Sequence, residues 1–364
     1  MNRISGLKKM FLICLLGMAN LPLFASGYQT ITNREVKSFY KNLPFEMEVL
    51  QIPKFKNYSV NIVDFGAVGD GTTINTEAIN SAIRQVSEKG GGTVVVPSGI
   101  WLTGPIVLLS NVNLFTEINA FVLFTPDFTN YPVVDAIFEG LNTKRCQSPI
   151  TAKNAVNIAI TGYGVFDGSG DACRPLKKEK MTDKQFKTLI KNGGVVSEDK
   201  KTWFPDEASK RAQEMCVDQN VPVGPVTDND WLAIRSFLRP VMVNFVNCKN
   251  ILLDGVTFQN SPAWNLHPLM SENIILNKVT VRNPWYSQNG DGIDLESCKN
   301  TLIVNSSFDV GDDAICMKSG KNEDGRARNM PTENVFVQNC SVYLGHGGCG
   351  GGRAGRREHD AGRR

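Results

Sequence analysis

The chain has 364 residues, of which 41% are hydrophobic and 21% charged, and its formal net charge is +3. This length permits a large buried core, and elongated repeat folds reach it as one domain. The basic excess lies in the two ends, since residues 27–348 alone carry a net charge of about −3, so the charge balance gives no evidence for a nucleic-acid partner.

Residues 1–26 have the pattern of a secretory signal. Three basic residues precede an apolar run over residues 10–18, and a plausible cleavage zone follows at residues 23–26. The apolar run is well short of the roughly 20 residues of a membrane-spanning helix. We therefore expect an exported protein, periplasmic or secreted, with a lipid anchor at Cys14 as the less favoured alternative.

A polar lead-in over residues 27–59 precedes the expected domain, which we place at residues 60–348. Residues 60–71 predict a strand that runs into a glycine-rich turn. An amphipathic helix follows, with Asn75 as a candidate N-cap and the glycines at 90–92 as its end. We expect this helix to close one end of an apolar stack.

The repeat pattern of the domain, described next, is interrupted at about residues 168–235. Within this interruption, residues 182–192 and 206–216 predict two short charged helices. The interruption has too few apolar residues for a core of its own. We interpret it as an excursion from one coil that walls one end of a cleft.

Short β-prone segments that begin with Asn repeat along the chain. Four copies align without gaps and a fifth is weaker; they begin at Asn157 (the weaker copy), Asn250, Asn273, Asn300 and Asn334. The spacings among the four are 23, 27 and 34 residues, so the cores are constant and the loops vary. This repeat predicts an all-β solenoid, a right-handed parallel β-helix, in which the recurrent Asn forms a structural ladder.

Acidic residues gather in two motifs, Asn289–Asp291 and Gly311–Asp313. Alignment of the strands that follow them places Asp291 opposite Asp313 on successive coils, about 4.8 Å apart as neighbouring strands are. Asp312 lies one residue out of this register and therefore points differently. Like charges this close raise the pKa of one partner or share a proton or a water. Glycoside hydrolysis needs such a division, with one protonated carboxyl for the leaving oxygen and one carboxylate that activates water.

A third motif, Gly345-His346-Gly347, places His346 12 residues after its repeat Asn, as Asp312 lies 12 residues after its own. The imidazole is therefore expected one coil from the acid, where it could tune the proton of Asp312 or bind substrate. Two alternatives stay open here, because Asp-rich turns often only satisfy backbone amides and clustered Asp oxygens also suit calcium. The seven cysteines of residues 27–348 show no CxxC spacing, so no zinc site is expected.

Together with FGAVGDG and GGGTVVVP near the N-terminus, these three motifs resemble glycoside hydrolase family 28, the polygalacturonases and their relatives, over about residues 60–348. The resemblance implies an inverting hydrolase of α-1,4-linked galacturonan in pectin that needs no metal and no cofactor. It implies Asp312 as the general acid, Asp291 and Asp313 as the residues that hold and activate the water, and His346 as their support. We expect a monomer without a nucleic-acid partner or a membrane span.

Three residues near these motifs are candidates for substrate binding: Asn289, His267 and Lys318. His267 lies on the coil before Asp291 and could line the cleft, with a structural role as the alternative. Lys318 could meet an anionic sugar, although pairing with Glu296 is the simpler role.

The sequence departs from the family pattern at two places. Gly290 stands where the family usually has Thr. The Arg-x-Lys motif that grips the substrate carboxylate downstream of Gly-His-Gly is absent, because residues 349–364 are rich in Gly and Arg and contain no Lys. We interpret this tail as a lost reading frame or a broken gene model rather than as a basic RNA-binding tail. We therefore expect the closing coils to be missing after Gly348 and hydrolysis to be impaired in the chain as written.

Two other classes of function stay open on the residues alone. One is a calcium-dependent pectate lyase-like enzyme on a similar solenoid, and the other is a non-catalytic solenoid that binds carbohydrate. A lyase would require the metal and release unsaturated products, whereas a binding protein would release no reducing ends.

Overall fold

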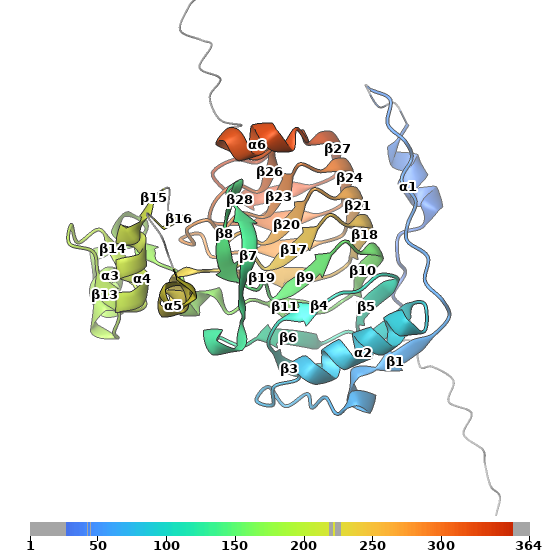
Figure 1. The fold of residues 1–364 in the computed structure, drawn as a ribbon. Helices are drawn as coiled ribbons and strands as arrows, with labels where there is room; N and C mark the ends of the chain where they lie inside the picture. The colour runs from blue at the N-terminus through green and yellow to red at the C-terminus, as the bar shows by residue number, and fades with distance from the viewer. Residues whose placement is uncertain (1–26, 42, 44, 218–220, 223–226, 352–364) are drawn as a thin grey trace, which may run out of the picture.

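The chain folds into a stack of parallel strands, shown in Figure 1. The computed structural model describes residues 27–41, 43, 45–217, 221–222 and 227–351. The expected signal over residues 1–26 lies outside the described residues, as do positions 352–364 of the Gly- and Arg-rich tail.

Three long sheets form the stack. Sheet A contains, in spatial order, β1 (Ser59–Asn61), β2 (Gly92–Val96), β5 (Val112–Thr116), β10 (Val156–Gly162), β18 (Lys249–Asp254), β21 (Glu272–Asn277), β24 (Lys299–Val304) and β27 (Glu333–Gln338). Sheet B contains β3 (Gly99–Thr103), β6 (Ala120–Phe124), β11 (Val165–Asp167), β19 (Thr257–Gln259), β22 (Thr280–Arg282), β25 (Ser307–Asp309) and β28 (Ser341–Leu344). Sheet C contains β4 (Ile106–Val107), β9 (Ile150–Lys153), β17 (Val243–Val246), β20 (Leu266–Leu269), β23 (Ile293–Glu296), β26 (Ile315–Lys318) and β29 (Gly350–Gly351).

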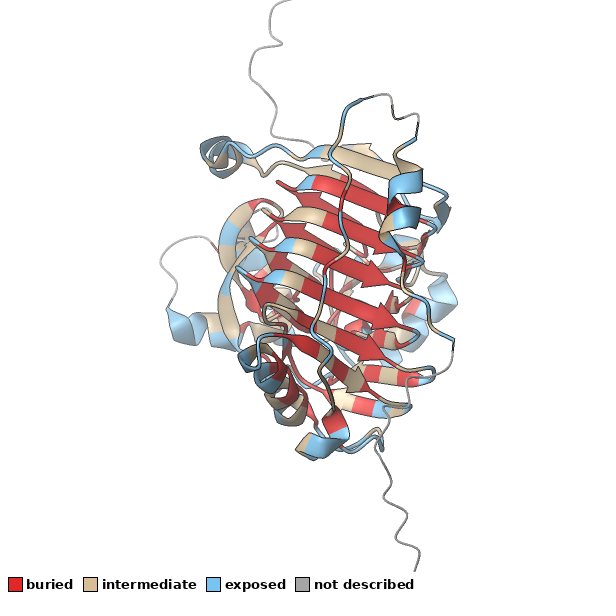
Figure 2. Ribbon diagram, turned by 90° about the vertical axis from the view of Figure 1, so that its right-hand side faces the viewer, coloured by how far each residue is buried: buried red, intermediate tan, exposed pale blue. Residues whose placement is uncertain are grey.

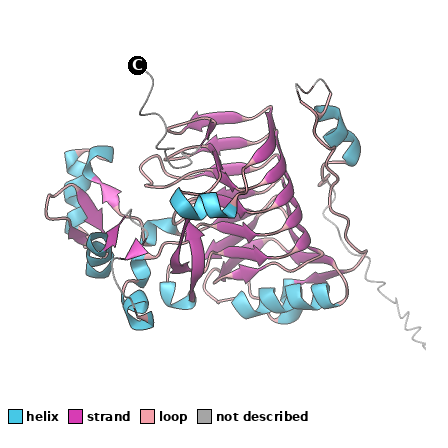
Figure 3. Ribbon diagram, turned by 45° about the horizontal axis from the view of Figure 1, so that its top comes forward, coloured by secondary structure: helices cyan, strands magenta, loops and turns pink. Residues whose placement is uncertain are grey.

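Neighbouring strands in all three sheets are parallel, and from β2 onward the chain visits sheets A, B and C in turn on each coil. This is a parallel β-helix, and it confirms the predicted fold class. Figure 3 shows the strands stacked in the body of the molecule and the helices at its periphery. Excursions from the coils occur mainly in the turns between sheet B and sheet C, so these turns can carry a site without disturbing the stack.

The core forms because equivalent apolar side chains on successive coils lie directly above one another. Ile158 pairs in register with Ile251, which pairs with Ile274, and all three are buried. In sheet B the rings of Phe166 and Phe258 stack with centroids 5.2 Å apart. Each coil covers the apolar face of its neighbour, as expected of a solenoid.

The recurrent Asn residues form the predicted ladder, which gains a sixth member at Asn111. Each side-chain amide donates to the side-chain oxygen of the Asn on the preceding coil; the donor–acceptor pairs are Asn157–Asn111 (3.0 Å), Asn250–Asn157 (2.9 Å), Asn273–Asn250 (3.0 Å), Asn300–Asn273 (3.2 Å) and Asn334–Asn300 (2.9 Å). All six have φ between 56° and 64°, a left-handed conformation that Asn tolerates better than most residues. The ladder therefore fixes the turn at the start of six of the eight strands of sheet A, from β5 onward.

The predicted amphipathic helix is α2 (Thr76–Glu88), and its buried positions, Ile79, Ala82, Ile83 and Val86, belong to the main core. Asn75 occupies the predicted N-cap position, but its side chain makes no capping hydrogen bond. Its amide instead accepts from the Val68 amide at 2.7 Å and donates to the Leu102 carbonyl at 3.1 Å. Asn75 therefore ties the glycine-rich turn to the first full coil.

The N-terminal lead-in crosses the outer face of sheet A, as Figure 2 shows from that side. Its short helix α1 (Asn33–Phe39) and flanking residues bury Ile31, Val36 and Leu50 against apolar side chains of β10, β18, β21 and β24. Asp254, at the end of β18, accepts from the Ile31 amide at 2.8 Å and from the Asn277 side chain at 2.7 Å. This polar anchor holds a segment that is more than two hundred residues away in sequence.

The interruption of the repeat lies between β11 and β17. It contains β12 (Leu176–Lys177), α3 (Asp183–Lys191), β13 (Val195–Val196), β14 (Thr202–Phe204), α4 (Glu207–Met215), β15 (Cys216–Val217), β16 (Val221–Pro222), α5 (Asp228–Ala233) and short 3-10 turns. The two predicted helices are confirmed, with Thr182 and Asp206 as their N-caps. Lys180 from this region donates to the carbonyl of Gly311 at 3.1 Å, so the excursion reaches the acidic motifs.

Two further excursions frame the outer face of sheet C. The antiparallel hairpin of β7 (Val133–Phe138) and β8 (Leu141–Cys146) precedes β9, and helix α6 (Asn322–Arg328) follows β26. The eight cysteines of the described chain are all free thiols. Among the described residues, no helix combines the length and apolar character that a bilayer crossing requires.

The ladder predicts the effect of replacing its central member. Asn273 makes one ladder hydrogen bond to each neighbouring coil. Asn273→Ala removes both bonds, worth about 1 kcal/mol each, and places Ala in a left-handed conformation that costs roughly 1–2 kcal/mol. We expect the free energy of unfolding in urea to fall by about 2–4 kcal/mol.

Asn273→Gly is the matched control, because glycine adopts the same backbone conformation without strain. It should lose about 1 kcal/mol less than Asn273→Ala. Equal losses in the two variants would show that the backbone conformation contributes nothing to the cost.

Candidate active site

Three carboxylates converge at the turns that lead into β23 and β26. Asp291, Asp312 and Asp313 each place a carboxylate oxygen within 4.8 Å of those of the other two. The backbone follows the predicted register, since the Gly292 amide donates to the Asp313 carbonyl at 2.9 Å. Asp291 is 4% exposed, whereas Asp312 and Asp313 are partly exposed. The predicted cluster is therefore present, with one buried and two accessible members.

Lys318 is the cation of this cluster. Its Nζ lies 2.5 Å from Oδ1 of Asp294 and 3.9 Å from Oδ2 of Asp291. Burial alone would lower the pKa of Lys318, but the two carboxylates outweigh it and raise the pKa. The same ammonium lies 3.6 Å from the ring centroid of Trp264, a cation–π contact. The expected pairing of Lys318 with Glu296 is wrong, because the side chain runs along the sheet toward Asp294.

The buried acids respond to this cation in a definite direction. Burial, with the charge of Asp294 as the second cause, raises the pKa of Asp291 well above its usual value, and the charge of Lys318 opposes the rise. Burial also raises the pKa of Asp294, again against Lys318. A base must be ionised to accept a proton. Lys318 is therefore the group that favours the ionised form of Asp291.

Glu296 belongs to a second charged group beneath the site. Burial by itself would raise its pKa, but hydrogen bonds and charge from His267 and Arg328 lower it to about 2. His267 Nε2 lies 3.0 Å from Glu296 Oε2, and Arg328 donates to Oε1 at 2.7 Å. The His267 side chain is fully buried, which corrects the expectation that it contacts substrate. It holds Glu296, and Arg328 ties helix α6 to the same carboxylate.

Asn289 lines the site with its amide held in one orientation. Its Oδ1 accepts from the buried Arg239 at 3.3 Å, and the same guanidinium donates to the carbonyls of Pro262 and Gln288 at 2.8 and 3.2 Å. With its oxygen turned to Arg239, Asn289 presents the NH₂ group to the pocket. The site therefore offers a donor here, which suits a carboxylate or hydroxyl oxygen.

His346 lies where the repeat predicted it. Its Nδ1 is 3.1 Å from Oδ1 of Asp312, and its backbone amide donates to the Asp312 carbonyl at 2.9 Å. A Cβ at Gly345 would lie 3.1 Å from the Asp312 carbonyl oxygen, and one at Gly347 would lie 2.9 Å from Oδ1 of Asp313. The two glycines therefore allow this coil to approach both acids closely.

The presence of glycine at position 290 also has a local structural cause. A Cβ there would lie 1.8 Å from Oγ of Ser287, and one at Gly311 would lie 2.4 Å from the same atom. Ser287 is buried and donates to the Pro284 carbonyl at 2.7 Å. The hydroxyl of Ser287 thus occupies the space that a side chain at position 290 would need.

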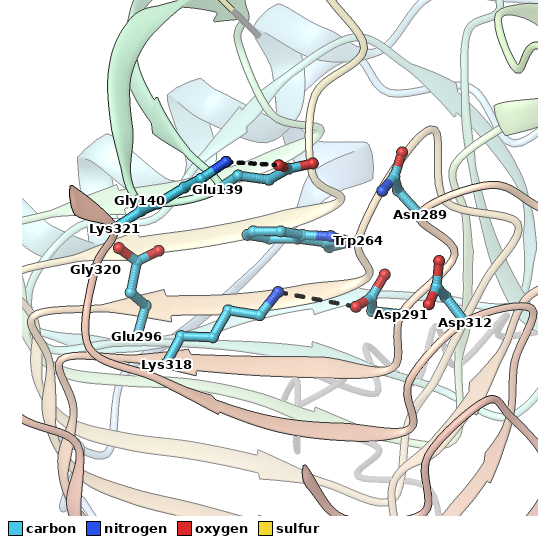
Figure 4. Close-up of a pocket in the computed structure, with 10 residues that line it drawn as sticks. All are labelled: Glu139, Gly140, Trp264, Asn289, Asp291, Glu296, Asp312, Lys318, Gly320 and Lys321. Carbon is cyan, nitrogen blue, oxygen red and sulfur yellow. Dashed lines mark ion pairs between the residues drawn. The ribbon is translucent and has the colours of Figure 1, made fainter. Parts of the chain in front are cut away.

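These groups surround a pocket of about 240 Å³ on the outer face of sheet C (Figure 4). Its lining residues are Glu139, Gly140, Trp264, Asn289, Asp291, Glu296, Asp312, Lys318, Gly320 and Lys321. Figure 4 shows Trp264 between Lys318 on one side and the turn of the β7–β8 hairpin on the other. The pocket therefore combines acids, two lysines and an aromatic face.

Comparison with known proteins identifies the family. Residues 236–361 match the model for glycosyl hydrolases family 28, and residues 59–167 match one for rhamnogalacturonase A/epimerase, pectate lyase-like proteins. The crystal structure of a hyperthermoactive exopolygalacturonase from Thermotoga maritima is 34% identical, with a TM-score of 0.65 over 84% of this chain and 65% of that one. The matched part of the chain, residues 236–361, belongs to glycosyl hydrolases family 28.

Curated relatives agree with this family 28 assignment. A probable polygalacturonase from Vitis vinifera is 29% identical over 77% of this chain and 48% of its own length. An exo-poly-alpha-D-galacturonosidase from Dickeya chrysanthemi is 28% identical over 79% of this chain and 46% of its own length. The chain thus spans about half the length of these two relatives.

The family 28 motifs were readable in the sequence, but several residues that complete the pocket were not. Arg239 and Arg328 contact the site through Asn289 and Glu296 and have no motif around them. Trp264 lies in none of the motifs named above, and only the structure shows its contact with Lys318. The hairpin turn had one available signal, a glycine between two β-prone segments.

Lys318 generates a prediction about pH dependence. If Asp291 serves as the base, as the family resemblance implies, it must be ionised, and the acidic limb of the pH profile of kcat/KM then reports its pKa. Lys318→Met removes the cation that lowers this pKa, and a neighbouring opposite charge is typically worth about 1–3 units. We expect the acidic limb for galacturonan cleavage to move to higher pH by about that amount.

Lys321→Met is the matched control, because Lys321 lines the same pocket but pairs with Glu139 at 3.9 Å. It should weaken substrate binding and leave the acidic limb in place. An unmoved limb in Lys318→Met would show that Lys318 does not set the ionisation of the base.

Proposed function

We propose that this chain hydrolyses α-1,4-galacturonosyl linkages in pectic polysaccharide by general acid–base catalysis. The observation that carries the proposal is the convergence of Asp291, Asp312 and Asp313 in a pocket that also holds Lys318 and Lys321. The acids can supply both proton transfers of glycoside hydrolysis, and the lysines can meet a carboxylate of an anionic sugar. Family membership and the names of the relatives, polygalacturonases, support the same substrate class.

In the proposed reaction Asp312 acts as the general acid. It donates its proton to the glycosidic oxygen as the bond from that oxygen to the anomeric carbon breaks. A water held between Asp291 and Asp313 attacks the anomeric carbon, and one of these carboxylates takes the water's proton. His346, 3.1 Å from Asp312, positions the acid and exchanges its proton with solvent. The products are a shortened chain and a sugar with a new reducing end.

The stereochemistry of this reaction requires its own test. Inverting enzymes usually hold their acid and base about 6.5–9.5 Å apart to admit a water, whereas the nearest oxygens here lie within 4.8 Å. In the proposed arrangement the water lies between Asp291 and Asp313, beside the acid. Proton NMR of the first product should show the β-anomer from the α-linked substrate, which is the inverted configuration.

The lysine at the cluster argues against the alternative of a calcium-dependent lyase. The ammonium of Lys318 pairs with Asp294 and lies 3.9 Å from Asp291, so it repels a divalent cation placed between them. Addition of a chelator should leave activity unchanged, and no unsaturated, ultraviolet-absorbing product should appear. We further propose that the protein works outside the cytoplasm, because intact pectic polysaccharide is too large to enter a cell.

The acid and the base generate the main prediction. Asp312→Asn and Asp291→Asn should each lower kcat on polygalacturonate by at least about 10²-fold, with little change in KM, because proton transfer is needed only in the transition state. Reducing-end release over long incubations measures the rate. Either variant with more than about a tenth of the parent kcat, a loss under 1.4 kcal/mol, contradicts its assigned role.

Asp309→Asn is the matched control, since Asp309 lies on the same coil as Asp312 but at the end of β25 in sheet B. It should leave kcat unchanged. Binding of trigalacturonate, followed by the fluorescence of the tryptophan at the pocket, should persist in Asp312→Asn. A binding protein without catalysis would show that binding but no reducing ends from any variant.

A further inference from the structure

We propose that the β7–β8 hairpin closes one end of the pocket, so that the site accepts a chain terminus and releases sugars from that end. The inference rests on the proposed function and adds the mode of action and the residues that decide it. Four observations carry it: a contact across the cleft, an aromatic wall, the size of the pocket and the backbone of the hairpin turn.

The contact across the cleft joins two excursions that arise on distant coils. The hairpin leaves the coil of β9, and the segment Gly320–Lys321 leaves the coil of β26, four strands further along sheet C. They meet closely, because a Cβ at Gly140 would lie 2.5 Å from the Lys321 amide nitrogen and 2.8 Å from the Gly320 carbonyl carbon. Glu139 and Lys321 add an ion pair at 3.9 Å. Both sides of this contact line the pocket, so together they form a roof over it.

The aromatic wall lies directly below the hairpin turn. Phe138, the last residue of β7, stacks on Trp264 with ring centroids 4.8 Å apart and planes 23° apart. Both rings are buried, with exposures of 3% and 2%. Arg145 on β8 lies with its guanidinium 4.0 Å from the centroid of Phe138 on the ring face. Stacked rings leave no gap for a sugar to pass, so a polysaccharide cannot continue through this side.

The pocket has room for a terminal residue rather than for a long chain. Its volume of about 240 Å³ lies below the roughly 300–1,000 Å³ of sites that enclose a drug-sized ligand. At its closed end stand Lys321 and Trp264, and the acids Asp291 and Asp312 line it further along. A terminal uronate can therefore place its carboxylate near the lysines and its ring near Trp264 while its glycosidic bond reaches the acids.

The turn at the tip of the hairpin is conformationally costly for its sequence. The loop between the paired residues Phe138 and Leu141 has two members, Glu139 with φ 49° and Gly140 with φ 76°. Two-residue loops of this kind prefer Asn-Gly or Asp-Gly, and a left-handed Glu costs roughly 1–2 kcal/mol relative to an ordinary backbone. The residue in this strained conformation, Glu139, is also the one that pairs with Lys321 and lines the pocket. The turn is therefore built for contact with the opposite excursion rather than for hairpin stability.

The test is the relation between viscosity and reducing ends during digestion of polygalacturonate. The 364-residue chain should release mono- or digalacturonate from the start, with a slow loss of viscosity for each reducing end formed. Early appearance of mixed longer oligomers with a steep viscosity loss would overturn the inference and leave the proposed hydrolysis intact. Absence of reducing ends would count against the proposed function, and the mode is then decided by the binding experiment below.

A shortened hairpin provides the decisive variant. Deleting residues 136–143 and joining Asp135 to Lys144 through Asn-Gly keeps the paired register below that point and removes Phe138, Glu139 and Gly140 together. The viscosity loss for each reducing end should rise several-fold, because the polymer can now lie across the acids. The matched control is Asp135→Asn, on the same hairpin but outside the pocket lining, whose products should remain mono- or digalacturonate.

A binding measurement tests the roof without turnover. In the Asp312→Asn background, trigalacturonate, its form reduced at the reducing end, and trigalacturonate unsaturated at the other end are titrated against tryptophan fluorescence. A closed pocket predicts that one end modification abolishes binding and that the shortened hairpin restores it. Equal binding of all three sugars by the unshortened chain would contradict the closed end.

Discussion

The in-register stacking of successive coils is the constraint on which the rest of this structure depends. Parallel pairing sets one coil about 4.8 Å above the next, and the Asn ladder fixes the turn at which each coil re-enters sheet A. Loops between the strands vary freely in length because this ladder resets the register on every coil. Residues far apart in sequence, such as Asp291 and Asp313, are brought together by that reset rather than by any contact of their own.

The acids stacked on one face of the solenoid would repel one another, and nearby cations compensate their charge. Asp291, Asp294 and Glu296 are all nearly or fully buried on one strand and the turn before it, where an uncompensated carboxylate is costly. Lys318 from the next coil forms ion pairs with Asp291 and Asp294, and Arg328 from α6 forms one with Glu296. The compensation differs in kind, because Glu296 is held firmly ionised while burial keeps the pKa of Asp291 raised. Two buried carboxylates five residues apart, Asp291 and Glu296, therefore have pKa values shifted in opposite directions.

The fold could be predicted from sequence because its signal is repeated. Each copy of the Asn-led segment supports the others, so the sheet, the ladder and the relative placement of the two acidic motifs and His346 followed from alignment alone. Interactions made once carry no such signal. Asn75 has the residue type and position of a helix cap, but a loop and a neighbouring strand compete for its amide.

The same limit explains the errors at the site. Lys318 lies opposite Glu296 in the strand register, which made their pairing the natural expectation. The side chain is long enough to reach Asp294 instead, because His267 and Arg328 already occupy Glu296. His267 lies on the predicted coil but is buried, whereas a position lining the cleft was one of its two expected roles. A sequence does not show what covers a side chain. The hairpin and α6, which cover the pocket, belong to excursions that differ from coil to coil and follow no repeat.

The N-terminal segment across sheet A has a consequence for how the molecule comes apart. In a solenoid built only from nearest-neighbour contacts, coils can fray from an end one at a time. Here Ile31, Val36 and Leu50 pack on strands from four coils at once, so losing one coil also weakens the hold on the others. The segment therefore couples coils that do not touch one another and makes their unfolding more cooperative. Because it can dock only on coils already assembled, it should order late in folding, when its long-range contacts first become available.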